Sequence, residues 1–369
     1  MRHKEQRCGL KIKTEHFFLF SSVLILVYVY LLDRIDFSGE EKTVYDDYNE
    51  IVASYSVSKN KKPRLDEYIV GWNVTKDVNW LLDFSIVGFP KTGTSTLMLY
   101  LKNQTQSIYI FDDERCELGW NRHVPLLQDL YRMYPGPHIK MGIKCPRDLE
   151  VDLALDNYKR FFPLTKFIVG VRHPIEWFES LYNFRVHNGF PMLPPEKLIG
   201  KCRKLNYGVC TDRANFSQHL SKIDTNRKVF LYEINQLKNN DEASSFSSSP
   251  SPSENIAKKN KERVHLFLSD LTEFLNLETP LEGPMLHIKP GLEPLSLEHE
   301  NALLSMKINI CHERYITLRR LLLQQALESA RWIENKFLSN PNTKVSYPKH
   351  FMHLLKQWHV DPCYKKGID

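Results

Sequence analysis

The stretch IVGFPKTGTST at residues 86–96 constrains the fold more than any other part of the sequence. An apolar run leads into a turn with Gly88 and Gly93, and a helix-like segment follows. A strand, a glycine-containing turn and a helix N-terminus form an anion site, because backbone N–H groups and the helix dipole face the ligand. The two glycines match the phosphate loop G-x-x-x-x-G-K-[ST], but Thr94 replaces its lysine and Lys91 lies inside the turn. The sequence therefore predicts an anion loop unlike that of the nucleoside triphosphatases.

Further strand candidates alternate with helical segments after this loop. Strands are expected at 84–88, 138–144, 166–171 and 228–232, and helices at 95–102, 149–161, 174–184 and within 303–338. Such alternation predicts an α/β fold with a P-loop-like parallel sheet flanked by helices. Ligands of such folds bind at the carboxyl ends of the strands.

The N-terminal part contains an uncharged apolar run at residues 17–32, preceded by basic residues. A membrane-spanning helix needs ~20 such residues, and basic residues before it favour a cytoplasmic N-terminus. We expect a cytoplasmic tail at 1–16, a transmembrane signal anchor at 17–32 and a polar stem at 33–80. A single catalytic domain follows at 81–369, with a flexible Ser/Pro-rich insertion at 239–263. The alternatives for the apolar run are a cleaved signal peptide and a buried core helix, but no small-residue cleavage site follows it.

This organisation is that of a single-pass type II protein whose catalytic domain is lumenal, and the short span suits the early secretory pathway and the Golgi membrane. Three N-x-[ST] sequons agree with a lumenal glycoprotein: Asn73, Asn103 and Asn215. Six cysteines follow the apolar run, which permits disulfide bonds. Cys202 and Cys210 are close enough for a local loop closure, and a Cys311–Cys363 bond would fix the C-terminus. Free buried thiols are the alternative.

The formal net charge of +6 excludes few functions, because five basic and two acidic residues precede the apolar run and the remainder is only mildly basic. No stripe of Lys and Arg interleaved with aromatic residues is present, so we expect no nucleic-acid binding. No H-E-x-x-H or paired C-x-x-C motif occurs, and His312-Glu313 lacks partners. We therefore expect no metal site.

A second anion motif, VGVRHPIEWFESLYNF, occupies residues 169–184. Arg172 follows a strand, Pro174 starts a helix at a position that tolerates proline, and Ser180 lies eight residues after the arginine. Both polar side chains can converge on one anion at the sheet's edge, and an arginine fork suits a phosphate.

Together the two motifs resemble those of sulfotransferases that use 3′-phosphoadenosine 5′-phosphosulfate (PAPS). FPKTGTSTLMLYL is similar to the family's 5′-phosphosulfate loop, and the Arg172–Ser180 pair to its 3′-phosphate clamp. The resemblance covers about residues 84–277 with gaps, and is closest to the Golgi-type carbohydrate enzymes of the heparan-sulfate group. It implies that PAPS is bound by the following residues: Lys91, Thr92, Gly93, Thr94, Ser95, Thr96, Arg172 and Ser180.

The catalytic residues expected from the motifs are Lys91, Glu114 and Lys144. Lys91 would neutralise the leaving phosphate. Glu114, in YIFDDERCELGW, matches best the base that family members carry roughly twenty residues after the loop lysine. GIKCPRD resembles the family's Lys-x-Pro motif, so that Lys144 would also face the sulfuryl group. The rival bases are Glu117 and Asp113, with His123 and His138 as further alternatives.

The resemblance thus implies sulfuryl transfer from PAPS to a hydroxyl or amine of a glycan in the Golgi lumen. The transfer is an in-line displacement that needs alignment, a base and cations, but no metal or covalent intermediate. A P-loop nucleotide kinase-like enzyme and an inactive membrane-anchored nucleotide- or glycan-binding protein are the alternatives. The acceptor stays open among polysaccharide, glycoprotein glycan, glycolipid and tyrosine. Adenine contacts and oligomeric state are not predicted.

Overall fold

The computed structural model describes residues 62–237, 254–285 and 305–364, and the side chains of 254–261 are not included. The chain divides into two units, Met1–Lys62 and Pro63–Asp369, and all elements described below belong to the second. The predicted cytoplasmic tail and signal anchor lie outside the described residues, as does the stem up to residue 61. Within the described ranges, no helix has both the length and the apolar character required to span a bilayer.

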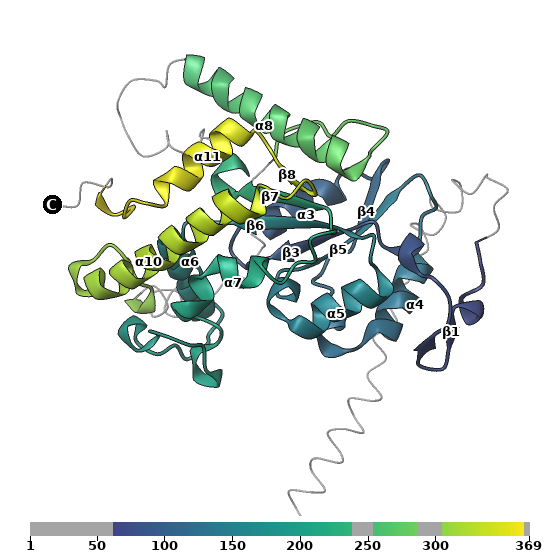
Figure 1. Cartoon of the computed structure of the whole chain (residues 1–369), viewed down its shortest axis with the longest axis horizontal. Helices are drawn as coiled ribbons and strands as arrows, with labels where there is room; N and C mark the ends of the chain where they lie inside the picture. Colours follow the sequence, from purple (N-terminus) through teal and green to yellow (C-terminus); the bar gives the residue numbers. More distant parts are fainter. Residues whose placement is uncertain (1–61, 238–253, 286–304, 365–369) are drawn as a thin grey trace, which may run out of the picture. The chain divides into compact units, whose positions relative to one another are not determined.

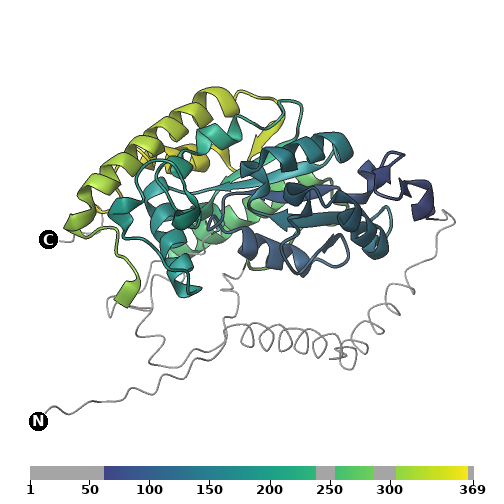
Figure 2. The same ribbon diagram turned by 90° about the horizontal axis from the view of Figure 1, so that it is seen from below.

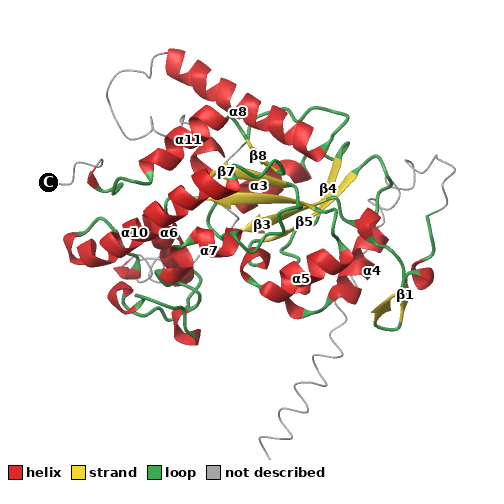
Figure 3. Cartoon of the chain, in the orientation of Figure 1, coloured by secondary structure: helices red, strands yellow, loops and turns green. Residues whose placement is uncertain are grey.

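A parallel sheet of six strands forms the centre of the second unit, in the order β4-β5-β3-β6-β7-β8 (Figures 1 and 3). The strands are β3 Phe84–Gly88, β4 Ile108–Ile110, β5 Lys140–Cys145, β6 Lys166–Val171, β7 Val229–Glu233 and β8 Thr343–Val345. The α/β prediction and its four strands are confirmed. These four are apolar and almost entirely buried, as strands covered on both faces must be. The two unpredicted strands are edge strands of three residues each.

Helices pack on both faces of the sheet, as Figures 1 and 2 show. One core joins alternate strand residues such as Phe84 and Ile86 to α3 Thr94–Lys102 and α8 Glu254–Leu275. The other core contains Val87 and several helices. These helices are α4 His123–Met133, α5 Asp152–Phe161, α6 Pro174–His187, α7 Phe216–Leu220, α10 Ile316–Trp332 and α11 Pro348–Gln357. The alternation of neighbouring residues between the cores is the period of two expected for a strand.

The domain begins earlier than residue 81. A short 3-10 helix, Leu65–Glu67, and a two-stranded hairpin, β1 Ile69–Val70 with β2 Asn73–Val74, lie in the region predicted as stem. Ile69 and Val78 are buried, and Trp80 packs edge-on against Tyr134 at 4.8 Å. The polar composition of this region concealed the scattered apolar residues that attach it to the domain.

Three further predictions differ from the structure. The predicted insertion 239–263 overlaps α8, which begins at Glu254, because its Lys- and Glu-rich end is favourable for a helix; residues 238–253 lie outside the described residues. The predicted helix 149–161 begins as a 3-10 turn, Asp148–Glu150. Helical spacing within 303–338 corresponds to α10 and a π-helical turn, Ile333–Phe337.

Three disulfide bonds join the six cysteines after the apolar run. Cys202–Cys210 and Cys311–Cys363 are confirmed, and the third bond, Cys116–Cys145, was not predicted. The sequon at Asn215 does not fit a glycan, because this side chain is 1% exposed and accepts a hydrogen bond from Ser217. Asn73 and Asn103 are exposed.

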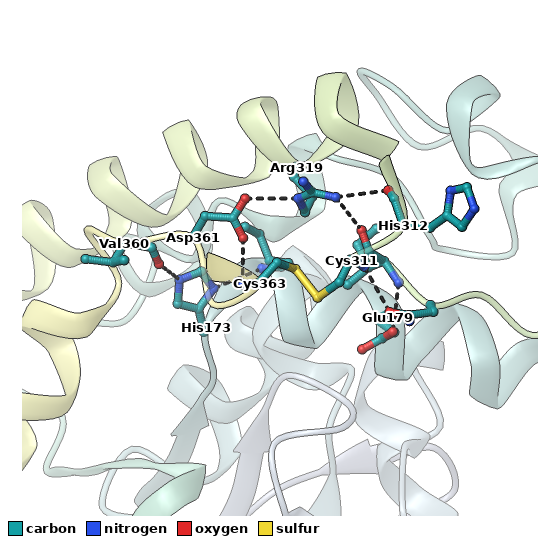
Figure 4. The surroundings of a disulfide bond; sticks show 11 residues. His173, Glu179, Cys311, His312, Arg319, Val360, Asp361 and Cys363 are labelled. Carbon is teal, nitrogen blue, oxygen red and sulfur yellow. Dashed lines mark hydrogen bonds and ion pairs between the residues drawn. A yellow bond between two sulfur atoms is a disulfide. The ribbon is translucent and has the colours of Figure 1, made fainter. Parts of the chain in front are cut away.

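The C-terminal segment is attached beside the start of α6 (Figure 4). Arg319 forms a buried ion pair with Asp361 and donates hydrogen bonds to the carbonyls of Ile310 and His312. Burial lowers the pKa of His173 to about 4. The neutral ring donates from Nε2 to the Val360 carbonyl at 3.2 Å. The last ninety residues, which showed no resemblance, therefore complete the surroundings of the predicted phosphate arginine.

Candidate active site

The loop between β3 and α3 has an unusual backbone. Lys91 has φ +67° and Gly93 has φ +86°. A left-handed conformation is uncommon for a lysine, and such strain is concentrated at functional sites. At Gly93 an added Cβ would lie 2.8 Å from Leu237 Cδ1, so both the dihedral angle and the packing require glycine.

Three consecutive carbonyls of this loop accept hydrogen bonds from the protein itself. The bonds are Thr92 Oγ1 to Phe89 O at 2.7 Å, Trp177 Nε1 to Pro90 O at 2.8 Å and Arg172 Nη1 to Lys91 O at 3.4 Å. The first bond closes the loop on itself, and the bonds from Trp177 and Arg172 hold it against α6 and the end of β6. The Thr92 side chain is fully buried, so that only its backbone N–H is left for the predicted contact with the ligand.

The helix α3 begins at Thr94, and its N-cap residue Gly93 makes no side-chain capping bond. The first turn of any helix has N–H groups without intrahelical partners. Thr94, Ser95 and Thr96 lie on this first turn, as predicted. A nine-residue helix with an uncapped N-terminus after a tight turn can bind a phosphate or sulfate group.

Arg172 lies next to this loop because β3 and β6 are neighbouring parallel strands with Gly88 opposite Gly170. Its guanidinium is 19% exposed, and Nε lies 3.5 Å from Glu176 Oε2. This Nε–H is buried and makes no hydrogen bond. Ser180 is half-buried, one turn beyond Glu176 on the same face of α6. The partly exposed guanidinium thus lies beside the anion loop, with Glu176 as its carboxylate partner.

Lys91 has few partners for its charge. Its Nζ lies 4.3 Å from the ring centroid of Phe184. Burial lowers the pKa of Lys91, and the charges of Arg172 and Lys144 lower it further. Three cations are therefore close together at the carboxyl ends of β3, β5 and β6, and this concentration of positive charge favours binding of a multiply charged anion.

Lys144 and Glu114 meet on the other side of the loop. Lys144 is near the carboxyl end of β5 and is 3% exposed. Its Nζ donates to Ser95 Oγ at 2.9 Å and forms an ion pair with Glu114 Oε1 at 3.0 Å. The Glu114 side chain is about half exposed, at 52%. The structure thus brings the best-matching predicted base next to the predicted anion loop.

The rival carboxylates have different surroundings. Glu117 forms an ion pair with Arg115 at 2.7 Å, and Arg115 also pairs with Asp129. Glu117 is therefore part of an ion-pair network that joins the segment after β4 to α4. Asp113 is exposed to solvent. Neither contact set includes the anion loop.

The two alternative histidines lie away from the site. The His138 side chain is 77% exposed, precedes β5 and lies 3.7 Å from Glu278. It is thus near the amino ends of the strands, opposite to Lys91. The His123 ring stacks on the ring of Phe161 with centroids 4.5 Å apart. Phe161 ends α5 and lies five residues before the start of β6, near the amino ends of the strands. Burial lowers the pKa of His123.

Arg185 lies within electrostatic range of Glu114 and Arg147, and aromatic rings pack against both arginines. The Arg147 guanidinium lies 5.2 Å from the ring of Trp120, which is 61% exposed. Arg185 lies 5.0 Å from the Phe190 ring, and its Nε–H is buried without a hydrogen bond. Burial lowers the pKa of Arg185, as do nearby arginines including Arg147, while Glu114 raises it. These residues form a polar and aromatic surface beside the predicted base.

Two cavities lie at opposite ends of the strands, one at the carboxyl ends and one at the amino ends. One of about 220 Å³ is lined by residues of α6, β7 and the C-terminal segment, including His173, Glu176 and Trp358. It adjoins Arg172 through Glu176. The other, of about 430 Å³, includes Lys140 and Lys166, the first residues of β5 and β6. The larger cavity is therefore at the amino ends of the strands, away from the anion loop.

Several residues of the site were not predicted. Trp177, Glu176, Phe184 and Arg185 all belong to α6. Glu176 follows Arg172 by four residues, so an ion pair along the helix could have been read from the sequence. The contacts of the other three depend on tertiary packing, and no local pattern indicated them.

Comparisons with known proteins are distant. Neither a protein family model nor a curated protein sequence matches the chain. Among solved structures, a sulfotransferase from Alicyclobacillus acidocaldarius is similar with a TM-score of 0.43 and 12% identity, covering 72% of this chain and 99% of its own. The sulfotransferase domain from the curacin biosynthetic pathway has a TM-score of 0.35 and 16% identity, covering 57% of this chain and 78% of its own. Likenesses this weak do not assign an activity.

Proposed function

We propose that this chain transfers a sulfuryl group from PAPS to a hydroxyl or amine of a glycan acceptor. The observation that carries the proposal is the meeting of two anion-binding elements at neighbouring strand ends. The uncapped N-terminus of α3 and Lys91 form one, and the partly exposed Arg172 guanidinium forms the other. Arg172 Nη1 lies 3.4 Å from the Lys91 carbonyl. PAPS carries phosphate groups at both ends of its ribose and needs two such elements.

The residues of this chain fit the transfer of a sulfuryl group. The acceptor oxygen forms a bond to sulfur while the bond from sulfur to the phosphate oxygen breaks. Glu114 would take the acceptor proton, and Lys91 would neutralise the charge on the leaving phosphate. Lys144, fixed between Ser95 and Glu114, would stabilise the equatorial oxygens. The lowered pKa of Lys91 also favours donation of its proton to the leaving oxygen.

A glycan is the proposed acceptor because of the surface beside Glu114. Exposed aromatic rings such as Trp120 can stack against sugar rings, and arginines such as Arg147 and Arg185 can bind hydroxyl or acidic groups. We further propose a single-pass type II protein of the Golgi membrane with a lumenal catalytic domain. The 17–32 run, the exposed sequons Asn73 and Asn103 and the three disulfides support this location.

Radiosulfate transfer from labelled PAPS to a panel of glycans and a tyrosine peptide tests the proposal. The full chain should label at least one glycan without added metal, and Lys91→Ala should abolish the labelling. Binding of adenosine 3′,5′-bisphosphate (PAP) without transfer to any acceptor would instead indicate a binding protein. Magnesium-dependent turnover of ATP would indicate a kinase, and labelling of the peptide alone would overturn the glycan acceptor.

A further inference from the structure

We propose that the Cys116–Cys145 disulfide is a positioning element that holds Glu114 against Lys144. This inference rests on the proposed function, because it concerns the base of that reaction. Cys116 lies two residues after Glu114, and Cys145 directly follows Lys144. The bond brings their Cα atoms to 5.2 Å. It therefore joins the segment that carries the base to the strand that carries its cationic partner.

The segment has little regular structure of its own. Between the end of β4 at Ile110 and the 3-10 helix Glu117–Trp120, the described chain contains no helix or strand. Near Glu114 its non-covalent ties to β5 are the 3.0 Å ion pair and one backbone bond, from Arg115 N to Lys144 O at 2.9 Å. Lys144 is buried, but the Glu114 carboxylate is about half exposed, so water competes with this ion pair. The covalent bond is thus the firm attachment beside the base.

The Cys116–Cys145 disulfide is anchored in a buried part of the domain. Cys145 is completely buried, and the two sulfur atoms and a carboxylate oxygen of Asp148 lie within 4.8 Å of one another. The sulfurs are bonded to each other, so they cannot be thiolate metal ligands here. Asp148 accepts a hydrogen bond from Tyr158 at 3.0 Å. Because Cys145 is buried and paired within the sheet, the disulfide fixes the position of Cys116 relative to β5.

The loop and arginine proposed to bind PAPS are held in place by contacts other than the Cys116–Cys145 disulfide. The anion loop is held by Thr92, Trp177 and Arg172, all outside the residues that the disulfide connects. Its contact with β5, from Lys144 Nζ to Ser95 Oγ, belongs to a strand that pairs with β3 and β4 on both sides and is therefore held in the sheet without the disulfide. Loss of the disulfide should therefore impair the use of Glu114 and leave PAP binding intact. A disulfide with only a structural role would affect the two properties together.

A double-mutant cycle on the full-length protein tests this inference. Cys116→Ala/Cys145→Ala avoids a buried hydroxyl at position 145, and Cys202→Ala/Cys210→Ala is the matched control at the distant loop. We expect the first pair to lower kcat about 10-fold to 100-fold, with PAP affinity by calorimetry within about 2-fold. We expect Glu114→Gln to lower kcat about 100-fold or more in the native protein, but only about 3-fold without the disulfide, because the carboxylate is no longer placed.

Equal effects of Glu114→Gln in both backgrounds would overturn the inference, as would a parallel loss of PAP binding. If the alanine pair does not fold, insertion of one glycine between Glu114 and Arg115 keeps the bond and displaces the base. This insertion should lower kcat and spare PAP binding, and unchanged kcat would contradict the proposal. A native protein that transfers no sulfate would refute the proposed function itself, which separates the two failures.

Discussion

The two sides of the site are built in different ways. The side proposed to bind PAPS, here called the donor side, consists of a strand, a strained loop and a helix N-terminus, and bonds from Trp177 and Arg172 to two loop carbonyls join it to the corner between β6 and α6. The side proposed to face the acceptor, here called the acceptor side, is an irregular segment that carries Glu114 and is attached to β5 by a disulfide, one ion pair and one backbone hydrogen bond. Binding of phosphate requires a particular backbone, whereas a base requires only one carboxylate at one point.

This difference explains why the anion-binding side of the site could be predicted from the sequence and the segment around Glu114 less well. Backbone N–H groups that converge on an anion require glycine and small polar residues at fixed spacing, so the donor side appears as a motif. The acceptor segment can be any loop of suitable length. Its position is set by a distant cysteine, which a single sequence does not pair.

The largest expected effect is that of Lys91→Ala. Removal of the cation at the leaving phosphate should lower kcat about 1,000-fold or more. Lys102→Ala is the matched control, because Lys102 lies at the far end of α3, the helix that follows the Lys91 loop, and pairs with Asp112 at 2.6 Å. Radiosulfate transfer at saturating PAPS measures both variants. Retention of activity by Lys91→Ala would break the assignment of the donor side.

Glu114→Gln comes next and tests the acceptor side alone. We expect kcat to fall about 100-fold to 1,000-fold, because the amide cannot accept the acceptor's proton. PAP affinity should not change. Asp113→Asn is the control, since its side chain is exposed on the same segment. An equal loss in the control, or none in Glu114→Gln, would mean that another group is the base.

Arg172→Ala should weaken PAP binding about 100-fold, because a bidentate charged contact to the 3′-phosphate is lost. Adenosine 5′-phosphate lacks this group, so its affinity should change by less than about 3-fold. Calorimetry with both nucleotides measures the difference, and Arg160→Ala on α5 is the control. An equal loss for both nucleotides would place the arginine in a structural role.

The last prediction concerns stability rather than turnover, and it tests the buried carboxyl of Asp148 beneath the disulfide with the variant Asp148→Asn. Burial raises the pKa of Asp148 to about 7, above the 3.8 of the unfolded chain. The folded state retains its proton between these values, so its contribution to stability is full below pH 3.8 and is lost as the pH rises through 7. The loss is on the order of 4 kcal/mol over the whole interval, of which about 3 kcal/mol falls between pH 5 and pH 8.

Urea unfolding at pH 5 and pH 8 measures this loss. The native protein should lose more stability over the interval than Asp148→Asn, which cannot titrate at this position. Asp156→Asn, exposed on α5, should behave like the native protein. An identical pH dependence in the native protein and Asp148→Asn would contradict the burial of a titrating carboxyl beneath the disulfide.

Much of the fold could be predicted, because short sequence patterns were enough to indicate its inner strands. The runs FSIVG and KFIVGV are short and apolar, and both are buried inner strands. The edge strand Thr343–Val345 was not predicted because its three residues are only partly buried and have no distinctive pattern. Lys91, Arg172 and Glu114 were predicted by spacing and resemblance. The contacts of Trp177 and the bond between Cys116 and Cys145 depend on segments distant in sequence.

The most direct test of the central claim is a crystal structure of the protein with PAP. We expect the 5′-phosphate at the N-terminus of α3, within about 3 Å of first-turn N–H groups, and the 3′-phosphate at Arg172. Glu114 and Lys144 should lie on the side of the 5′-phosphate that PAP leaves open. Binding of PAP in the cavity beside Lys140 and Lys166, or with its 3′-phosphate away from Arg172, would contradict the account.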